Sequence, residues 1–162
     1  IMERLVGSEM CIRDSSLGDP EIIAYLYKAS QAGVKIDCIV RGICCLRPGL
    51  EGISDNIKVV SIVGRYLEHS RIFYFYNKGK EEVYIGSADW MPRNLDRRVE
   101  AITAVEDPEI AKELQEIMGI LLSDNRQAWD LQPDGKYIQR RSTDNFPELA
   151  CHKILMETVA NN

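Results

Sequence analysis

The sequence has 162 residues and a formal net charge of −5, with 45% hydrophobic and 28% charged residues. This length suits one domain with a sizeable core, and the composition is that of a folded globular protein rather than a disordered or fibrous one. The acidic balance argues against nucleic acid as the main partner, although a local basic cluster can still bind an anion. No apolar run reaches the roughly 20 residues that a membrane-spanning helix requires, so no membrane span is expected.

The five cysteines form no CxxC pair and no metal-ligand spacing. The odd cysteine count and the lack of a recognisable secretory leader predict reduced thiols and a cytoplasmic location. His69 and His152 are the two histidines of the sequence. A histidine-rich metal site is therefore not expected, and no metal ligand is assigned to this chain.

Residues 1–16 show neither a helical nor a strand period, and Glu3, Arg4 and Glu9 interrupt their apolar residues. We expect them to be a leader, unrelated to the rest of the chain or disordered, which stands in place of a missing first strand. The domain itself is accordingly predicted to cover residues 17–162.

Residues 19–21 (DPE) are typical of a helix start, and Gly33 ends the helical pattern that follows them. An apolar strand is predicted over residues 34–40, and a helix, a glycine turn and a strand in this order indicate an α/β layer. Arg41 follows this strand directly. In open α/β sheets ligands collect beyond the carboxyl ends of the strands, which makes Arg41 a candidate ligand contact.

The rest of the chain predicts further strands and two more helices. Strands are expected over residues 57–63, 70–76, 82–88 and 98–105, with a hairpin turn at 77–80 and short edge strands at 125–131 and 137–141. One helix is expected to begin at residues 107–109 (DPE), and a last helix is expected over residues 146–159. Residues 64–68 are predicted to form a short helical turn, and residues 91–94 a loop.

His69 and Arg71 are two residues apart, so on a strand both side chains leave the same face. Burying a guanidinium without a partner is expensive, so this face should meet solvent or an anion. Imidazole and guanidinium together can bind a phosphoryl oxygen and supply a proton to a leaving oxygen. The alternative is a surface arginine paired with Glu68 or Glu82, which contributes little energy.

Arginine outnumbers lysine among the basic residues from 41 to 98, and its planar fork suits bidentate phosphate contacts. A solvated face and a site for a polyanion or a nucleotide phosphate are both compatible with this cluster. Glu100 lies near the start of the fifth predicted strand. Its carboxylate is a candidate to accept a hydrogen bond from the His69 ring and so fix the tautomer of that ring.

Several of these residues resemble the phospholipase D superfamily pattern of HxK, GSxN and a downstream glutamate. They are His69 and Arg71, residues 86–89 (GSAD), Arg93 and Glu100. The sequence is more similar still to the polyphosphate kinase family (the type 1 enzymes), in its C-terminal phospholipase D-like catalytic subdomain. That similarity is carried by Arg41-Gly42 with Leu46 and by residues 51–56 (EGISDN), 66–69 (YLEH) and 87–91 (SADWM).

The resemblance implies an α/β fold, a phospholipase D-like mixed sheet flanked by helices that is one half of a two-lobed catalytic unit. It implies ATP-dependent, reversible extension of polyphosphate through a phosphohistidine in the other half, with Mg²⁺ accompanying ATP and held in that half. Arg41, His69 and Arg71 are then contacts for ATP or phosphate, His69 is also a candidate proton donor, and Glu100 orients His69. The implied partners are ATP or ADP, polyphosphate and the remaining domains, and the full-length enzyme is expected to be a homo-oligomer.

The sequence departs from the superfamily pattern at three positions. Arg71 replaces the lysine, Asp89 replaces the asparagine, and Tyr76 stands where an aspartate is expected. These differences argue against a phosphodiesterase that works alone. Two alternatives stay open: a phospholipase D-like phosphodiesterase or nuclease acting as a homodimer, and a non-catalytic phosphate-binding or interface module. We expect the isolated chain to bind phosphate anions without turnover.

Overall fold

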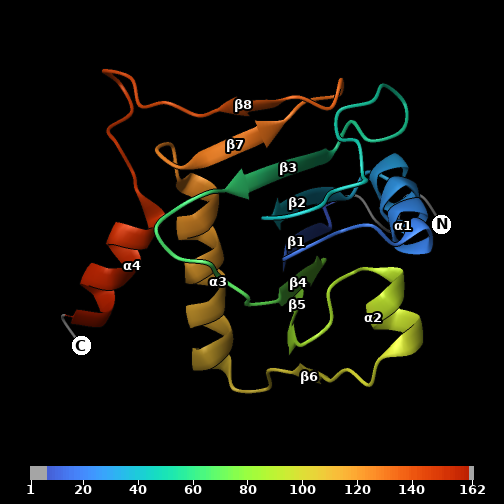
Figure 1. Ribbon diagram of the computed structural model, residues 1–162. Helices are drawn as coiled ribbons and strands as arrows, with labels where there is room; N and C mark the ends of the chain where they lie inside the picture. Colours follow the sequence, from blue (N-terminus) through green and yellow to red (C-terminus); the bar gives the residue numbers. More distant parts are fainter. Residues whose placement is uncertain (1–6, 161–162) are drawn as a thin grey trace.

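The computed structural model describes residues 7–160, which form an open eight-stranded sheet flanked by helices (Figure 1). The strand order from side to side is β6-β5-β4-β1-β2-β3-β7-β8. The strands are β1 (Glu9–Asp14), β2 (Lys35–Val40), β3 (Ile57–Ile62), β4 (Ile72–Asn77), β5 (Lys80–Gly86), β6 (Ile102–Ala104), β7 (Ala128–Leu131) and β8 (Tyr137–Gln139). The mixed α/β fold predicted from the sequence is confirmed.

The helices are α1 (Pro20–Gln31), α2 (Pro92–Arg97), α3 (Pro108–Ser123) and α4 (Cys151–Ala160). The two helices that follow a DPE sequence begin in the same way, because Asp19 and Asp107 each accept hydrogen bonds from two free amide groups of the first turn. No helix within residues 7–160 combines the length and the apolar character needed to span a membrane.

The directions of the strands decide where side chains meet. β1, β2 and β3 are parallel to one another, whereas β4 runs antiparallel to β1 and β7 runs antiparallel to β3. β5 and β8 are in turn antiparallel to β4 and β7. One end of the sheet therefore holds the ends of β1, β2, β3, β5 and β8 together with the starts of β4 and β7. We call it the carboxyl end.

The alternation of side chains along the strands builds a core on each face of the sheet. Val59 packs in one cluster with Leu26 of α1. Its neighbour Val60 packs in another cluster with Leu121 of α3 and Cys151 of α4. Helix α1 therefore covers one face, and α3 and α4 cover the other.

The first strand corrects the expectation of a leader over residues 1–16. Within the described part, Glu9–Asp14 form β1, which pairs with β2 on one side and β4 on the other. The expectation of a disordered leader is wrong for these residues, while residues 1–6 lie outside the described part. A strand in the middle of a sheet is covered on both faces, so its sequence need not alternate, and the short apolar run at Met10–Ile12 is sufficient.

Two local predictions are also wrong. Residues 64–68 do not form a helical turn, and the amide of Tyr66 donates to the ring of His152 instead of to a helical carbonyl. Residues 91–94 are not a loop, because α2 begins at Pro92, a residue suited to the first position of a helix. The hairpin at residues 77–80 is confirmed, with positive φ angles of 50° at Lys78 and 96° at Gly79.

Candidate functional site

The carboxyl end of the sheet gathers charged residues from several segments. Asp14 ends β1, Arg41 follows β2, and the segment with His69 and Arg71 leads into β4. Asp89 follows β5. Residues that are far apart in the sequence therefore meet here, because the parallel strands leave the sheet where the antiparallel strand β4 enters it.

Arg41 has a hydrogen-bond donor that is free to bind an anion. Its Nε atom is buried and has no hydrogen-bond partner among the described residues. It lines a small cavity of about 20 Å³ together with Arg13, Glu68 and Ser70. A buried donor without a partner costs about 1–3 kcal/mol, so any acceptor that reaches Nε, such as an oxygen of an anion, recovers that free energy.

His69 does not itself line the cavity at Arg41, although its neighbours Glu68 and Ser70 do. The side chain of His69 is exposed, and within residues 7–160 its ring has no hydrogen-bond or ion-pair partner. Its carbonyl oxygen accepts a 2.8 Å hydrogen bond from Nη1 of Arg71. The expectation that His69 and Arg71 share a strand face is wrong, because β4 begins only at Ile72.

Arg71 is bound to a carboxylate of the protein. Its Nε and Nη2 atoms lie 2.9 and 2.7 Å from Oδ1 of Asp89, and both side chains are largely buried. Burial opposes the ionisation of Asp89, but hydrogen bonds from Arg71 and Asp14 and the charge of Arg71 outweigh it and lower the pKa of Asp89. The guanidinium of Arg71 is therefore ion-paired with Asp89, and its positive charge lies beside the site in that position.

Asp14 and Asp89 form a buried pair of carboxyl groups. Burial, together with a hydrogen bond to Asp89 and the charge of Asp89, raises the pKa of Asp14 to about 7, although the amides of Trp90 and Ser15 oppose this shift. The Trp90 amide donates to Oδ2 of Asp14 at 2.9 Å. The pair joins the end of β1 to the segment after β5, and Arg71 places a positive charge beside it.

A second buried ion pair holds the segment that carries His69. Arg13, whose side chain is 7% exposed, donates to the carboxylate of Glu68 and to the carbonyl of Ser70. Burial lowers the pKa of Arg13, Glu68 opposes that shift, and the charge of Arg41 adds to it. Nε2 of the buried His152 lies 3.4 Å from the same carboxylate oxygen of Glu68. The segment is thus held between β1 and α4.

Glu100 lies at the carboxyl end but is bound to other partners than His69. The hydroxyl of Ser87 donates to one carboxylate oxygen, and Nδ2 of Asn94 donates to the other at 2.7 Å. These two hydrogen bonds, followed by the charges of Arg98 and Arg71, lower the pKa of Glu100 against a small opposing effect of burial. Among the described residues no hydrogen bond joins Glu100 to the His69 ring.

Comparison with known proteins identifies the family. Residues 3–150 match the sequence pattern of the family described as polyphosphate kinase C-terminal domain 2. The chain belongs to this family. The resemblance inferred from the sequence is therefore confirmed, and the cluster described above is a candidate site within this C-terminal domain.

Similar proteins place the chain within longer ones. It is 70% identical over 127 residues to polyphosphate kinase from Synechocystis sp., a match that covers 78% of this chain and 17% of that protein. The crystal structure of polyphosphate kinase from Porphyromonas gingivalis is similar with a TM-score of 0.91 and 39% identity, covering 99% of this chain and 26% of that one. The phospholipase D family member Nuc from Salmonella typhimurium shares the fold, with a TM-score of 0.60 and 16% identity over 81% of this chain and 88% of its own.

Three residues of this polyphosphate kinase site were not identified from the sequence. Arg13 and Asp14 fall within the expected leader, and the short apolar run before them is the one local sign that a strand lies here. Asp89 was seen only as a departure from a motif. Its pairing with Arg71 explains both departures together, because an arginine beside an aspartate forms a charge pair that lysine and asparagine would not form.

The site has no evident metal-binding group of its own. Within residues 7–160, no group of three or more histidine, cysteine, aspartate or glutamate side chains is arranged to hold a metal ion. Asp14 and Asp89 already satisfy each other and Arg71. The described residues of this site therefore do not fit a Mg²⁺ site.

Proposed function

We propose that the chain is the C-terminal catalytic part of an ATP:polyphosphate phosphotransferase, one half of a two-lobed unit. In this proposal the terminal phosphate of ATP is transferred reversibly to polyphosphate through a phosphohistidine carried by the other half. The chain corresponds to 17% of the Synechocystis relative, so that half would lie elsewhere in the full-length protein. The observation that carries the proposal is the buried, unpartnered Nε of Arg41 in the cavity beside the His69 segment.

Each candidate residue has a role in this proposal. Arg41 binds phosphoryl oxygens and stabilises the charge on the group being transferred, which is the dominant form of catalysis in phosphoryl transfer. His69, exposed and without a protein partner, contacts a phosphate and donates a proton to the leaving oxygen. Arg71 contributes positive charge from its pair with Asp89. Glu100 orients the His69 ring when substrate is bound, exchanging a present hydrogen bond for one to the ring.

The partners of the chain belong to the same proposal. ATP or ADP and polyphosphate are the substrates, and Mg²⁺ accompanies the nucleotide on ligands outside this chain. The full-length protein is proposed to act in the cytoplasm as a homo-oligomer. The chain by itself is proposed to bind phosphate anions without turnover, because the phosphohistidine is supplied by the other half.

The test uses a hybrid enzyme in which this chain replaces the matching segment of the Synechocystis enzyme. Arg41→Ala and His69→Ala are each expected to lower kcat/KM for polyphosphate synthesis by about 100-fold or more, the size of effect seen when one stabilising donor is removed from a transition state. His69→Gln is expected to retain ATP binding while losing the rate. The measurement is the initial rate of ADP release at several ATP concentrations.

Lys112→Ala is the matched control. This substitution also removes one positive charge, but the exposed lysine lies on α3, away from the carboxyl end. Full activity of the Arg41→Ala hybrid would contradict the proposal, and so would polyphosphate synthesis by the isolated chain. Hydrolysis of a nitrophenyl phosphodiester by the isolated chain, lost on His69→Ala, would instead support the homodimeric phosphodiesterase.

A further inference from the structure

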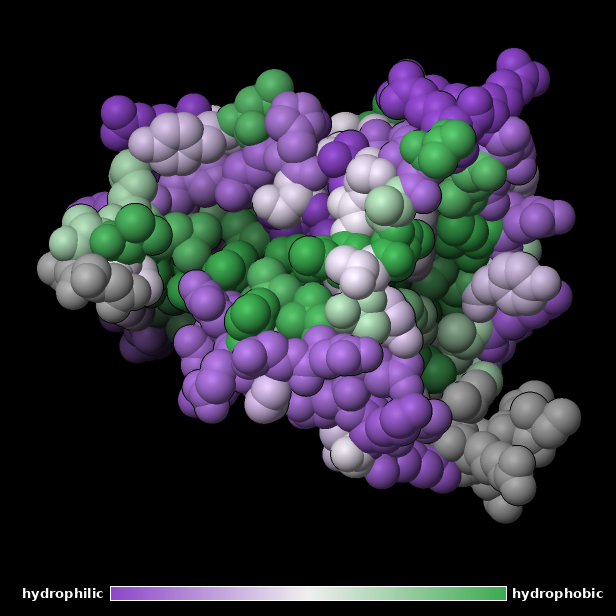
Figure 2. Space-filling model, turned by 90° about the horizontal axis from the view of Figure 1, so that it is seen from below, coloured by the Kyte–Doolittle hydropathy of each residue, from purple (hydrophilic) through white to green (hydrophobic). Residues whose placement is uncertain are grey.

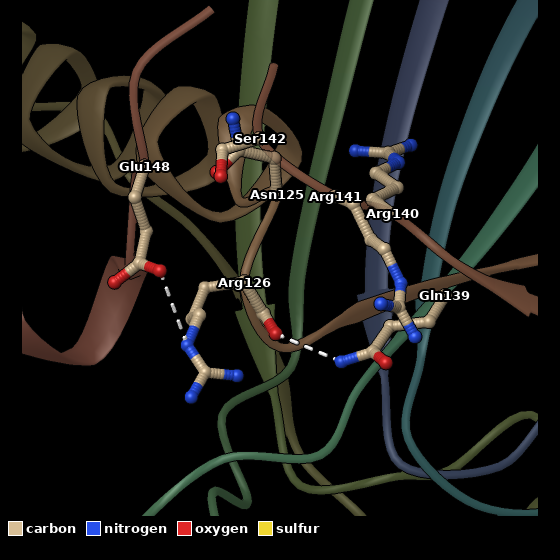
Figure 3. Close-up of a pocket in the computed structure, with 7 residues that line it drawn as sticks. All are labelled: Asn125, Arg126, Gln139, Arg140, Arg141, Ser142 and Glu148. Carbon is tan, nitrogen blue, oxygen red and sulfur yellow. Dashed lines mark hydrogen bonds and ion pairs between the residues drawn. The ribbon is translucent and has the colours of Figure 1, made fainter. Parts of the chain in front are cut away.

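A second arginine cluster lies at the carboxyl end of the sheet, beyond the candidate active site. Arg126, Arg140 and Arg141 line a hollow of about 450 Å³ together with Gln139 and Glu148 (Figure 3). We call it the arginine hollow. It belongs to none of the motifs by which the sequence resembles its family, and neither Arg41 nor His69 lines it.

The strand register places the arginine hollow at the same end of the sheet as the candidate active site. Ile62, the last residue of β3, is paired with Ala128, the first residue of β7, and Gln139 at the end of β8 is paired with Trp129. Arg126 precedes β7 and Arg140 follows β8. The exposed Arg65 lies in the segment that leaves β3, so basic residues continue from β2 across β3 to β7 and β8.

The arginine hollow is held in shape by a buried carboxylate. Asp124 is fully buried, and its Oδ1 atom accepts from the backbone amides of Arg126, Gln127 and Ala128 at 2.6–2.9 Å. Its Oδ2 atom accepts from the amide of Cys151 at 2.8 Å. The backbone that carries Arg126 is therefore fixed before any ligand arrives, which lowers the entropic cost of binding.

The three arginines differ in how many hydrogen bonds and ion pairs they already make within the protein. Arg140 is bound by both carboxylate oxygens of Asp130 and donates to the carbonyl of Leu122, so it is structural. Arg126 has only a surface ion pair with Glu148 at 3.3 Å, in which both side chains are 58% exposed. Arg141 is exposed, and within residues 7–160 its guanidinium has no hydrogen-bond or ion-pair partner.

Arg126 and Arg141 are therefore two guanidinium groups that a ligand can recruit at little cost, since an exposed ion pair contributes about 0–1 kcal/mol. Guanidinium forks match phosphate oxygens. A polyphosphate chain repeats this anion along its whole length, and most of the chain must lie outside the site where its end reacts. We propose that the arginine hollow binds a distal stretch of the polyphosphate chain whose end lies at Arg41 and His69. This inference rests on the proposed function.

The experiment measures binding of long-chain polyphosphate, tripolyphosphate and ATP to the full chain at low ionic strength. The arginine hollow is formed by residues of this chain, so the long chain should bind more tightly than tripolyphosphate. The double variant Arg126→Ala/Arg141→Ala is expected to weaken long-chain binding about tenfold, or about 1.4 kcal/mol, and to leave the affinities for tripolyphosphate and ATP unchanged. Glu148→Gln removes the competing carboxylate and is expected to strengthen long-chain binding about twofold.

Lys136→Ala is the matched control. Lys136 lies on the same hairpin, in the turn at the opposite end of the sheet, and its side chain is 81% exposed. An equal loss in Lys136→Ala, an equal loss of ATP binding in the double variant, or no preference for the long chain in the unaltered protein would each overturn the inference. Arg41→Ala tests the proposed function separately from this inference, because loss of that arginine should weaken the binding of all three ligands. If Arg41→Ala changes none of them, the proposed function fails whatever the arginine hollow does.

Discussion

The neighbouring carboxyl groups of Asp14 and Asp89 link the candidate active site to the stability of the fold. Asp14 is 3% and Asp89 6% exposed, and two carboxylates in contact cannot both ionise at low cost. The pair thus behaves as one titrating unit beside Arg71, and a change in its protonation changes the negative charge that this arginine faces.

Stability is predicted to fall as the pH rises from about 4 to about 7. The pKa of Asp14 is raised from 3.8 to about 7, so in this range the folded protein holds a proton that the unfolded chain has released. The slope attributable to Asp14 is at most about 1.4 kcal/mol per pH unit. The lowered pKa of Asp89 acts in the opposite sense, because its contribution is present above its ordinary pKa and is lost as the pH falls.

Asp14→Asn is expected to flatten this slope, measured as the free energy of unfolding in urea at several pH values. The comparison is with Asp96→Asn, which alters an exposed carboxylate of α2. The slope, rather than the absolute stability, is the readout, because Asp14→Asn also disturbs the hydrogen bond from Trp90. An Asp14→Asn protein with an unchanged slope would contradict the raised pKa of Asp14.

At the scale of the elements, α4 is connected to the active-site segment through a close contact at Gly64. A Cβ atom on Gly64 would overlap Cε1 and Nδ1 of His152, the buried histidine in the first turn of α4. The same imidazole accepts the amide hydrogen of Tyr66 and lies beside Glu68. The position of α4 and the path of the segment before His69 are therefore coupled.

Gly64→Ala is predicted to lower the free energy of unfolding by about 1–3 kcal/mol, because a side chain inserted against a buried ring forces packed groups apart. Gly119→Ala is the matched substitution, since a Cβ atom there meets nothing within 4 Å on the exposed side of α3. That change is expected to stabilise the protein by about 0.5–1 kcal/mol, the difference in helix propensity. Urea denaturation of both variants checks the two opposite signs. Equal effects would show that α4 is not packed against Gly64.

Most elements could be predicted from the sequence because their signals are local. Helix caps at residues 19–21 and 107–109 and the turn at 77–80 depend on a few neighbouring side chains. The role of β1 could not be recognised locally, since a central strand is defined by partners that lie far along the chain. The same holds within the site. Arg41 follows from its place after a strand, whereas the binding of Arg71 by Asp89 depends on β4 and β5 lying side by side.

At the scale of the whole molecule, an apolar groove ends beside the candidate active site. Its volume is about 540 Å³, and α3, α4, β4 and β5 line it with Ile72, Ile85, Leu114, Ile117, Leu155 and Val159, while Arg13, Glu68 and Arg71 of the site lie along it too. The face of the molecule in Figure 2 shows a hollowed apolar band between hydrophilic rims. An exposed apolar surface of this kind is typical of a contact with another domain.

Ile85→Glu is predicted to reduce the activity of the hybrid enzyme about tenfold or more, because docking of the other half would bury a carboxylate without a partner. Ile85 is 39% exposed in this chain, so the free energy of unfolding of the isolated chain is expected to change by less than about 0.5 kcal/mol. Ile53→Glu, at a residue 41% exposed in the turn before β3, is the control that should retain activity. Equal activity of the two hybrids would contradict a docking role for the groove.

Because β4 runs antiparallel to β1, the charged residues of the candidate site lie at one end of the sheet and the tight turns lie at the other. The turns at residues 49–56, 77–80 and 133–136 all lie away from Arg41 and His69, at the far end of the strands. The length of these turns can therefore vary without moving the charged groups of the candidate site. Loops at the carboxyl end have less freedom, because those after β1, β2 and β5 and before β4 carry the charged residues of the candidate site.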